Sequence, residues 1–130
     1  MREALEMPGP KKVLIVDDDA DIVKVLNLRL KTEGYDTSTA GDGNQAVTLA
    51  HRYRPDLILL DIAMPVGSGV DVMKKLAFST HTKDIPVIIV SAFPEEMKLF
   101  EGFENIKGYI RKPFELPVLL DRVKEALSES

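Results

Sequence analysis

The 130-residue sequence predicts an α/β fold in which helices cover both faces of an open, doubly wound parallel sheet. Short apolar runs without polar alternation recur along the chain, and such runs are typical of strands that are buried on both faces. Segments with apolar residues at helical spacing separate these runs. The alternation indicates five strands and five helices, joined in right-handed βαβ units.

Three of the expected strands are strongly apolar, and two are weaker. The strong candidates are rich in β-branched residues, which favour strands. The weak candidates are more polar, and the first of them suits the edge of a sheet. In chain order, the five candidates cover residues 13–16, 35–39, 56–60, 85–90 and 107–111.

The expected helices are apolar stripes with start or stop signals at their ends. Gly34 stops the first helix, and Arg54 with Pro55 ends the second. Pro94 opens a short fourth helix, and Pro117 is tolerated in the first turn of the fifth. The stripes cover residues 22–30, 46–53, 70–77, 97–103 and 116–127.

Length and composition indicate a single domain with one ordinary core. Pro8-Gly9-Pro10 interrupts any regular structure near the start, so residues 1–11 are expected to be a flexible tail and residues 12–128 the domain. No apolar run is long enough to span a bilayer and no secretory signal is visible. We therefore expect no membrane insertion and a cytoplasmic location.

Charge and cysteine content restrict the possible ligands. The net charge is -4 and no cluster of Lys or Arg exceeds a pair, so direct binding of nucleic acid is not expected. The chain has no cysteine, which excludes disulfides and thiolate metal sites.

Polar residues with distinct chemistry stand where the expected strands end. Asp17 and Asp18 follow the first strand, Asp61 the third, Ser91 the fourth and Lys112 the fifth. The carboxyl ends of parallel strands share one edge of the sheet, and ligand sites of open α/β sheets form at that edge where the strand order reverses. The sequence therefore predicts a polar site at this edge.

Three carboxylates that converge at such an edge repel one another and raise their own pKa values. Mg²⁺ would remove this conflict, because it prefers oxygen ligands and keeps several waters. Lys112 would supply a cation, and Ser91 a hydroxyl donor. Such a set can neutralise a phosphoryl group attached to one carboxylate, which is the chemistry of aspartyl phosphate formation.

Four stretches of the chain, "VLIVDDDADI", "PDLILLDIAMPVGSG", "PVIIVSA" and "GYIRKPF", resemble the receiver domain of bacterial two-component response regulators. Each stretch alone is a weak signal, but together and in this order they are specific. The likeness covers about residues 11–128. It implies a flavodoxin-like sheet with the strand order 2-1-3-4-5 of bacterial chemotaxis receivers. That order would place the first and third strands side by side and make Asp17, Asp18 and Asp61 converge.

The resemblance implies a role for each of these residues. Asp61 matches the phospho-accepting aspartate, and Lys112 matches the lysine that pairs with the phosphoryl group. The bond from Lys112 to Pro113 resembles a cis peptide of the family. Ser91 matches the switch hydroxyl, and Tyr109 matches the aromatic residue whose ring turns inward after phosphorylation. The implied Mg²⁺ ligands are Asp17, Asp18, Asp61 and the backbone carbonyl of Ala63.

The resemblance implies a phosphorylation-dependent signalling switch, not an enzyme beyond catalysing its own phosphorylation and dephosphorylation. A sensor histidine kinase or a phosphotransfer protein would donate the phosphoryl group. Phosphorylation would change the face formed by residues 97–103, 107–111 and 116–127. The changed face would alter the binding of a downstream protein or effector domain, or the formation of a phosphorylation-dependent dimer.

Two other functions stay open at this point. A phosphohydrolase with an aspartyl nucleophile would use a similar site, but such enzymes usually carry a second aspartate two residues after the nucleophile. This chain has Ala63 there. A non-phosphorylated pseudo-receiver usually lacks one of the key residues, whereas all of them are present in this sequence. The chain fits either a stand-alone receiver or a piece of a longer regulator.

Overall fold

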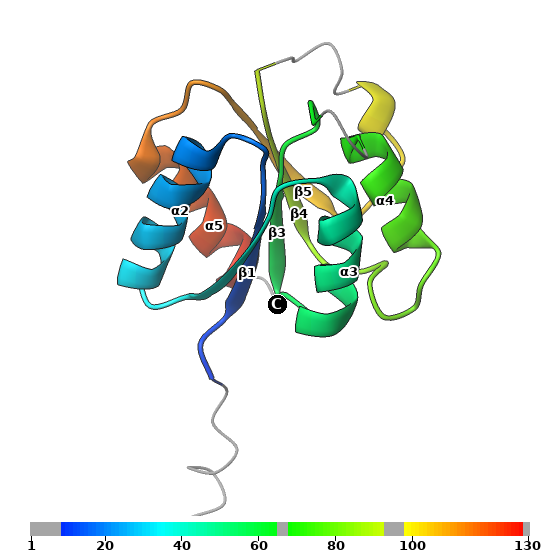
Figure 1. The fold of residues 1–130 in the computed structure, drawn as a ribbon, viewed down its shortest axis with the longest axis horizontal. Coiled ribbons are helices and arrows are strands. Elements are labelled where there is room, and N and C mark those ends of the chain that lie inside the picture. Colours follow the sequence, from blue (N-terminus) through cyan, green and yellow to red (C-terminus); the bar gives the residue numbers. More distant parts are fainter. Residues whose placement is uncertain (1–8, 65–67, 93–97, 129–130) are drawn as a thin grey trace, which may run out of the picture.

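A computed structural model describes residues 9–64, 68–92 and 98–128 of the chain, in which a five-stranded sheet lies between two layers of helices (Figure 1). The strands are β1 (Lys12–Val16), β2 (Asp36–Ala40), β3 (Leu57–Leu60), β4 (Val87–Ser91) and β5 (Ile106–Arg111). The helices are α2 (Ala20–Thr32), α3 (Gly43–Tyr53), α4 (Gly69–Ala77) and α5 (Leu116–Ser128).

The sheet is parallel throughout and has the order β2-β1-β3-β4-β5. The chain first moves from β1 to β2 on one side and then returns to place β3 on the other side of β1. The strand order therefore reverses between β1 and β3. This arrangement confirms the doubly wound sheet and the strand order implied by the resemblance.

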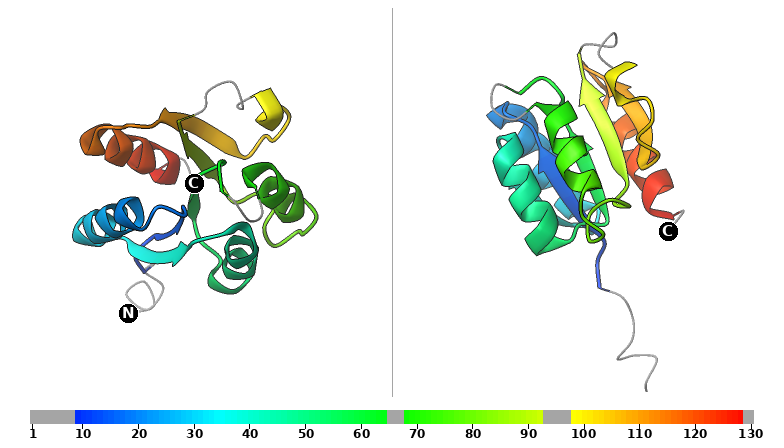
Figure 2. Two further views of the ribbon diagram at one scale, coloured as in Figure 1. Left: turned by 45° about the horizontal axis from the view of Figure 1, so that its top comes forward. Right: turned by 90° about the vertical axis from the view of Figure 1, so that its right-hand side faces the viewer.

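Each face of the sheet has its own apolar core. Leu14 and Val16 of β1 contribute to the core beneath α3 and α4, whereas Val13 and Ile15 contribute to the core beneath α2 and α5. Figure 2 shows the two helix layers on either side of the strands. Because both faces are covered, successive strand residues are apolar, which explains why the strands appear in the sequence as unbroken apolar runs.

Local signals set the ends of two helices, and both helices stop at the residues expected from the sequence. Asp19 caps α2, and its carboxylate accepts hydrogen bonds from the backbone N–H groups of Asp21 at 3.0 Å and Ile22 at 3.3 Å. Gly34 follows α2 with a φ of 97°, a conformation that glycine adopts without a steric penalty. The α3 helix ends at Tyr53, just before Arg54 and Pro55.

The expected helix over residues 97–103 is not an α-helix in the described part of the chain, which contains four α-helices and not five. Residues 98–100 form a single 3₁₀ turn, and residues 93–97, including Pro94 and Met97, lie outside the described residues. The turn is followed by Gly102, whose φ of 97° cannot continue a right-handed helix. Phe100 is only 1% exposed, so its apolar character reflects burial in the core beneath α3 and α4.

The predicted boundaries of the domain are not tested by the structure. Residues 1–8 of the expected tail lie outside the described residues, so the boundary at residue 11 is not tested. Among the helices that the structure describes, none is both long enough and apolar enough to cross a bilayer.

Candidate functional site

The backbone places Asp17 and Asp61 side by side at the reversal of strand order. Val16 pairs with Leu60 in the ladder between β1 and β3, so the next residue on each strand is an aspartate. The N–H of Asp61 donates to the carbonyl of Val16 at 2.9 Å, and the N–H of Asp17 donates to the carbonyl of Ala40 at 3.1 Å. These bonds extend the sheet by one residue and direct both aspartates to its carboxyl edge.

Asp17, Asp18 and Asp61 form a cluster that can hold a metal ion. Each of the three offers one carboxylate oxygen, and these oxygens lie within 4.8 Å of one another. Asp17 and Asp61 are 4% and 5% exposed, whereas Asp18 is exposed. Oxygens that share one Mg²⁺ at roughly 2.1 Å can be no more than about 4.2 Å apart. The three carboxylate oxygens lie near this spacing, and the donor set fits a hard divalent cation.

Lys112 brings a positive charge to the two buried carboxylates. Its Nζ lies 2.8 Å from Oδ2 of Asp17 and 3.4 Å from Oδ2 of Asp61. The N–H of Lys112 donates to the carbonyl of Ser91 at 2.9 Å, which ties the residue to the end of β4. The peptide bond between Lys112 and Pro113 is cis, as the resemblance implies.

The electrostatics of the cluster leave an excess of negative charge. Burial raises the pKa of Asp61 above 3.8, and the charge of Asp17 raises it further, against the opposing effects of the Ala63 N–H and of Lys112. Burial alone would lower the pKa of Lys112, but its hydrogen bond to Asp17 and the charge of Asp61 outweigh burial and raise that pKa. One ammonium group therefore contacts two carboxylates of a cluster of three, a balance that favours a second cation.

Two backbone amides orient the buried carboxylates. The N–H of Ala63 donates to Oδ1 of Asp61 at 3.1 Å, so the backbone at Ala63 lies beside the expected acceptor. The metal role of its carbonyl stays a prediction. The N–H of Asp19 donates to Oδ1 of Asp17 at 2.9 Å, a contact that was not predicted from the sequence. The only feature of the sequence that hints at this contact is the acidic run Asp17 to Asp19, and such a run equally suits a helix cap.

The two expected switch residues take different positions. Ser91 is fully buried at the end of β4, where it pairs with Arg111, the residue before Lys112. It therefore lies at the same edge as the carboxylates. Tyr109 lies two residues earlier on β5 and is 37% exposed, outside the acidic cluster.

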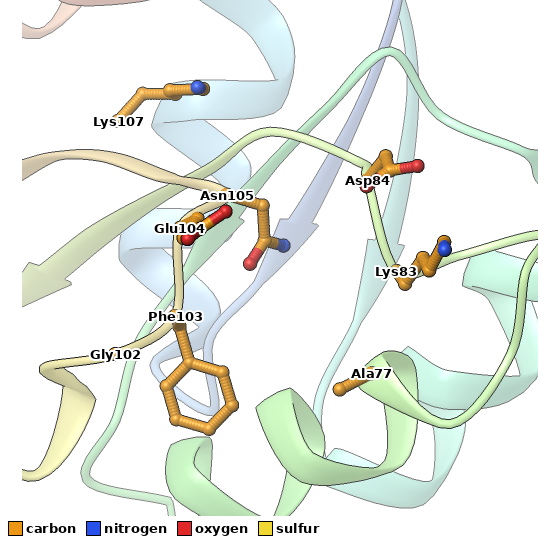
Figure 3. A pocket seen from close by; sticks show the side chains of 8 residues that line it. All are labelled: Ala77, Lys83, Asp84, Gly102, Phe103, Glu104, Asn105 and Lys107. Atoms are coloured by element: carbon orange, nitrogen blue, oxygen red, sulfur yellow. The ribbon is translucent and has the colours of Figure 1, made fainter.

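A hollow of about 490 Å³ in the described part of the structure is not at this edge. Figure 3 shows its lining, which includes Ala77, Phe103 and Asn105. All of its lining residues but Lys107, the second residue of β5, precede β4 or β5, so the hollow lies at the amino ends of these strands. A smaller hollow of about 320 Å³ adjoins Asp17 and Asp18 instead. The hollow beside Phe103 and the acidic cluster are thus at opposite edges of the sheet.

Comparison with characterised proteins identifies relatives in which the matched part is about half of the molecule. The chain is 36% identical over 118 residues to the DNA-binding response regulator MtrA of Mycolicibacterium paratuberculosis, a match covering 90% of this chain and 51% of MtrA. The chain spans about half the length of the curated relatives it matches.

These relatives contradict the expectation that direct binding of nucleic acid is excluded. That expectation was based on the net charge of -4, whereas the relatives are named as DNA-binding regulators. The net charge describes only a stretch equivalent to about half of such a protein. It carries no information about a DNA-binding portion elsewhere, so the exclusion was wrong.

Solved structures and a family model agree on the fold. The chemotaxis protein CheY4 of Vibrio cholerae superposes with a TM-score of 0.84 at 30% identity, covering 92% of this chain and 100% of CheY4. The receiver domain of a sensor histidine kinase from Pseudomonas aeruginosa, solved with a magnesium ion coordinated in the active site cleft, has a TM-score of 0.82 at 26% identity, covering 92% of this chain and 99% of that domain. The model of the response regulator receiver domain matches residues 13–124, and this chain therefore belongs to the response regulator receiver domain family.

Proposed function

We propose that this receiver domain is a signalling switch that accepts a phosphoryl group on Asp61 from a histidine kinase or phosphotransfer protein. The observation that carries the proposal is the position of Lys112 Nζ, 2.8 Å from Asp17 and 3.4 Å from Asp61. Both aspartates are buried, so an ammonium group and a carboxylate nucleophile face each other with little intervening water. A charged group transferred to Asp61 would find its counter-ion already in position.

In the proposed step, a carboxylate oxygen of Asp61 attacks the phosphorus atom of a phosphohistidine in line with the bond to nitrogen. A P–O bond forms as the P–N bond breaks, and the imidazole keeps the electron pair and takes a proton from solvent. Lys112 neutralises negative charge on the phosphoryl oxygens, and the N–H of Ala63 holds the acceptor in place. Positioning and charge neutralisation account for most of the catalysis in such transfers.

We propose Mg²⁺ as the metal of the acidic cluster, held by Asp17, Asp18, Asp61 and the carbonyl of Ala63. The convergence of three carboxylate oxygens supports a hard cation, and the similar Pseudomonas receiver was solved with magnesium in its cleft. When bound, Mg²⁺ would screen the negative charge of the acceptor and of the transferring group.

The output of the switch would run through Ser91 and Tyr109. The hydroxyl of Ser91 would bond the phosphoryl group, and Tyr109, now 37% exposed, would turn inward. The face formed by residues 98–103, β5 and α5 would then change its preference for a downstream protein or effector portion. A DNA-binding portion of the kind named for MtrA is a candidate recipient of the signal. The chain would catalyse only its own phosphorylation and dephosphorylation, and a cytoplasmic location stays a prediction.

A labelled small phosphodonor, such as acetyl phosphate, tests the proposal. The wild-type chain should become labelled with Mg²⁺ and not with a chelator present. Asp61→Asn should not be labelled, whereas Asp121→Asn, an equal loss of charge on the exposed face of α5, should be labelled normally. Label on the Asp61→Asn variant, or an inert wild-type chain, would refute the assignment.

A further inference from the structure

The first residue of α4 touches the backbone of the loop that carries Asp61. A Cβ atom added to Gly69 would lie 2.6 Å from Cα of Ile62, 2.7 Å from its Cγ2 and 2.9 Å from its Cβ. Carbon atoms in contact normally lie about 3.5–4.0 Å apart. The closest atom belongs to the backbone, so no flexible side chain can swing away. Gly69 starts a regular helix, so lack of space, and not its dihedral angles, requires glycine here.

Ile62 is the single residue between the expected acceptor Asp61 and the expected metal ligand Ala63. Its side chain is buried in the core beneath α3 and α4, and its carbonyl accepts the N–H of Gly69 at 3.3 Å. The N–H of Ala63 in turn donates to Asp61 at 3.1 Å. The position of Ile62 therefore determines how the two functional residues on either side of it are aligned.

The α4 helix cannot easily retreat from this contact. Val72, Met73 and Leu76 of the helix are buried in the same core as Ile62, and Ser68 caps its first turn. An added methyl group at position 69 must separate the helix and the loop by about 1 Å. The anchored helix would pass much of that displacement to the loop at residues 61–63.

We propose that Gly69 is a positioning residue for phosphoryl transfer. Its missing side chain lets the start of α4 sit on the backbone of Ile62, which aligns the Asp61 carboxylate and the Ala63 carbonyl for the metal and the phosphoryl group. This inference rests on the proposed function of Asp61. It goes beyond it in assigning a role in the site to a residue that touches neither metal nor phosphoryl group.

The test compares three variants of the full chain. Gly69→Ala introduces the clash. Gly41→Ala is the matched control, because a Cβ there meets nothing closer than Gln45 at 3.8 Å. Val72→Ala removes core packing from α4 without adding an atom at the contact and controls for loss of stability alone. Mg²⁺ affinity by isothermal titration calorimetry, labelling rate with acetyl phosphate and thermal unfolding are measured for each.

We expect Gly69→Ala to weaken Mg²⁺ binding by roughly 10- to 100-fold, which is the usual effect of substituting a residue that orients a metal ligand. Labelling should slow by roughly 100-fold, the effect of about 1 Å of misplacement. Gly41→Ala should match wild type, and Val72→Ala should unfold earlier while its Mg²⁺ affinity is unchanged. Wild-type Mg²⁺ affinity and labelling rate in Gly69→Ala, or an equal loss in Val72→Ala, would overturn the proposal.

If Gly69→Ala does not fold, hydrogen exchange of the wild-type chain decides the matter. The Gly69 N–H, bonded to the Ile62 carbonyl, should exchange more slowly once Mg²⁺ saturates the site, and unchanged exchange would overturn the proposal. A wild-type chain that is not labelled would instead refute the proposed function. A labelled wild type with an unaffected Gly69→Ala variant would refute only the role of Gly69.

Discussion

Lys112 and Asp17 form an ion pair of 2.8 Å although 95 positions separate them in the sequence. The same ammonium group lies 3.4 Å from Asp61, so a single lysine bridges two buried carboxylates from different strands. A buried charge is costly when its partner is removed. Changes to these charged residues should therefore alter both the stability of the protein and the rate of phosphoryl transfer, and both can be measured.

Replacing Lys112 by Met removes the ammonium group but keeps most of the side-chain volume. The pKa of Asp61 should rise further, because Lys112 is one of the groups that lower it. Labelling by acetyl phosphate should fall about 100- to 1,000-fold, the usual effect of losing one group that stabilises a developing charge. Lys112→Arg keeps the charge in a different shape and should recover only part of the rate. A Lys112→Met variant with an unchanged rate would exclude the proposed role.

Asp61→Asn should stabilise the metal-free protein at neutral pH. The pKa of Asp61 is raised by burial and by Asp17, so folding favours its protonated form. Its contribution to stability is complete below pH 3.8 and is lost as the pH rises through the higher pKa of the folded state. The advantage of the Asn variant in urea unfolding should therefore shrink as the pH falls from 7 towards that range. A difference that stays flat with pH would contradict this account.

Asp18→Asn should abolish most of the stabilisation by Mg²⁺ while leaving the metal-free protein as stable as wild type, because Asp18 is exposed. In the wild-type chain, Mg²⁺ at ten times its Kd should add about 1.4 kcal/mol. The matched control is Asp19→Asn, the same change one residue later. Asn caps a helix as well as Asp does, so this variant should respond to Mg²⁺ normally. Thermal unfolding with and without Mg²⁺ measures both, and an equal response of the two variants would count against Asp18 as a ligand.

Phe100→Ala should lower the free energy of unfolding by about 3–5 kcal/mol, the usual cost of emptying a buried aromatic site. Phe100 is 1% exposed and packs beside Phe103, with ring centroids 6.4 Å apart. Its neighbour Leu99 is 60% exposed, so Leu99→Ala should change the stability by less than about 0.5 kcal/mol. Urea unfolding of the two variants would test whether the 3₁₀ turn is anchored by this one side chain.

The comparison of the strands with the region around Phe100 shows where sequence patterns are informative. Residues 57–60 and 87–90 are buried on both sides, so their unbroken apolar runs predicted strands correctly. The spacing of Phe100 and Phe103 also matches a helix, yet the chain there makes only a 3₁₀ turn before Gly102. The spacing of apolar residues indicates which side chains are buried in the core. A short segment can bury the same side chains without forming an α-helix.

The sequence by itself determined which chemical groups the site would contain. Asp17, Asp18, Asp61, Ser91 and Lys112 each follow an expected strand, and parallel strands end at one edge. Only the tertiary structure decided that Lys112 lies closer to Asp17 than to Asp61, and that Gly69 rests on Ile62. These relations depend on how distant segments pack in three dimensions. Local propensity and periodicity describe single segments and cannot encode the spacing between them.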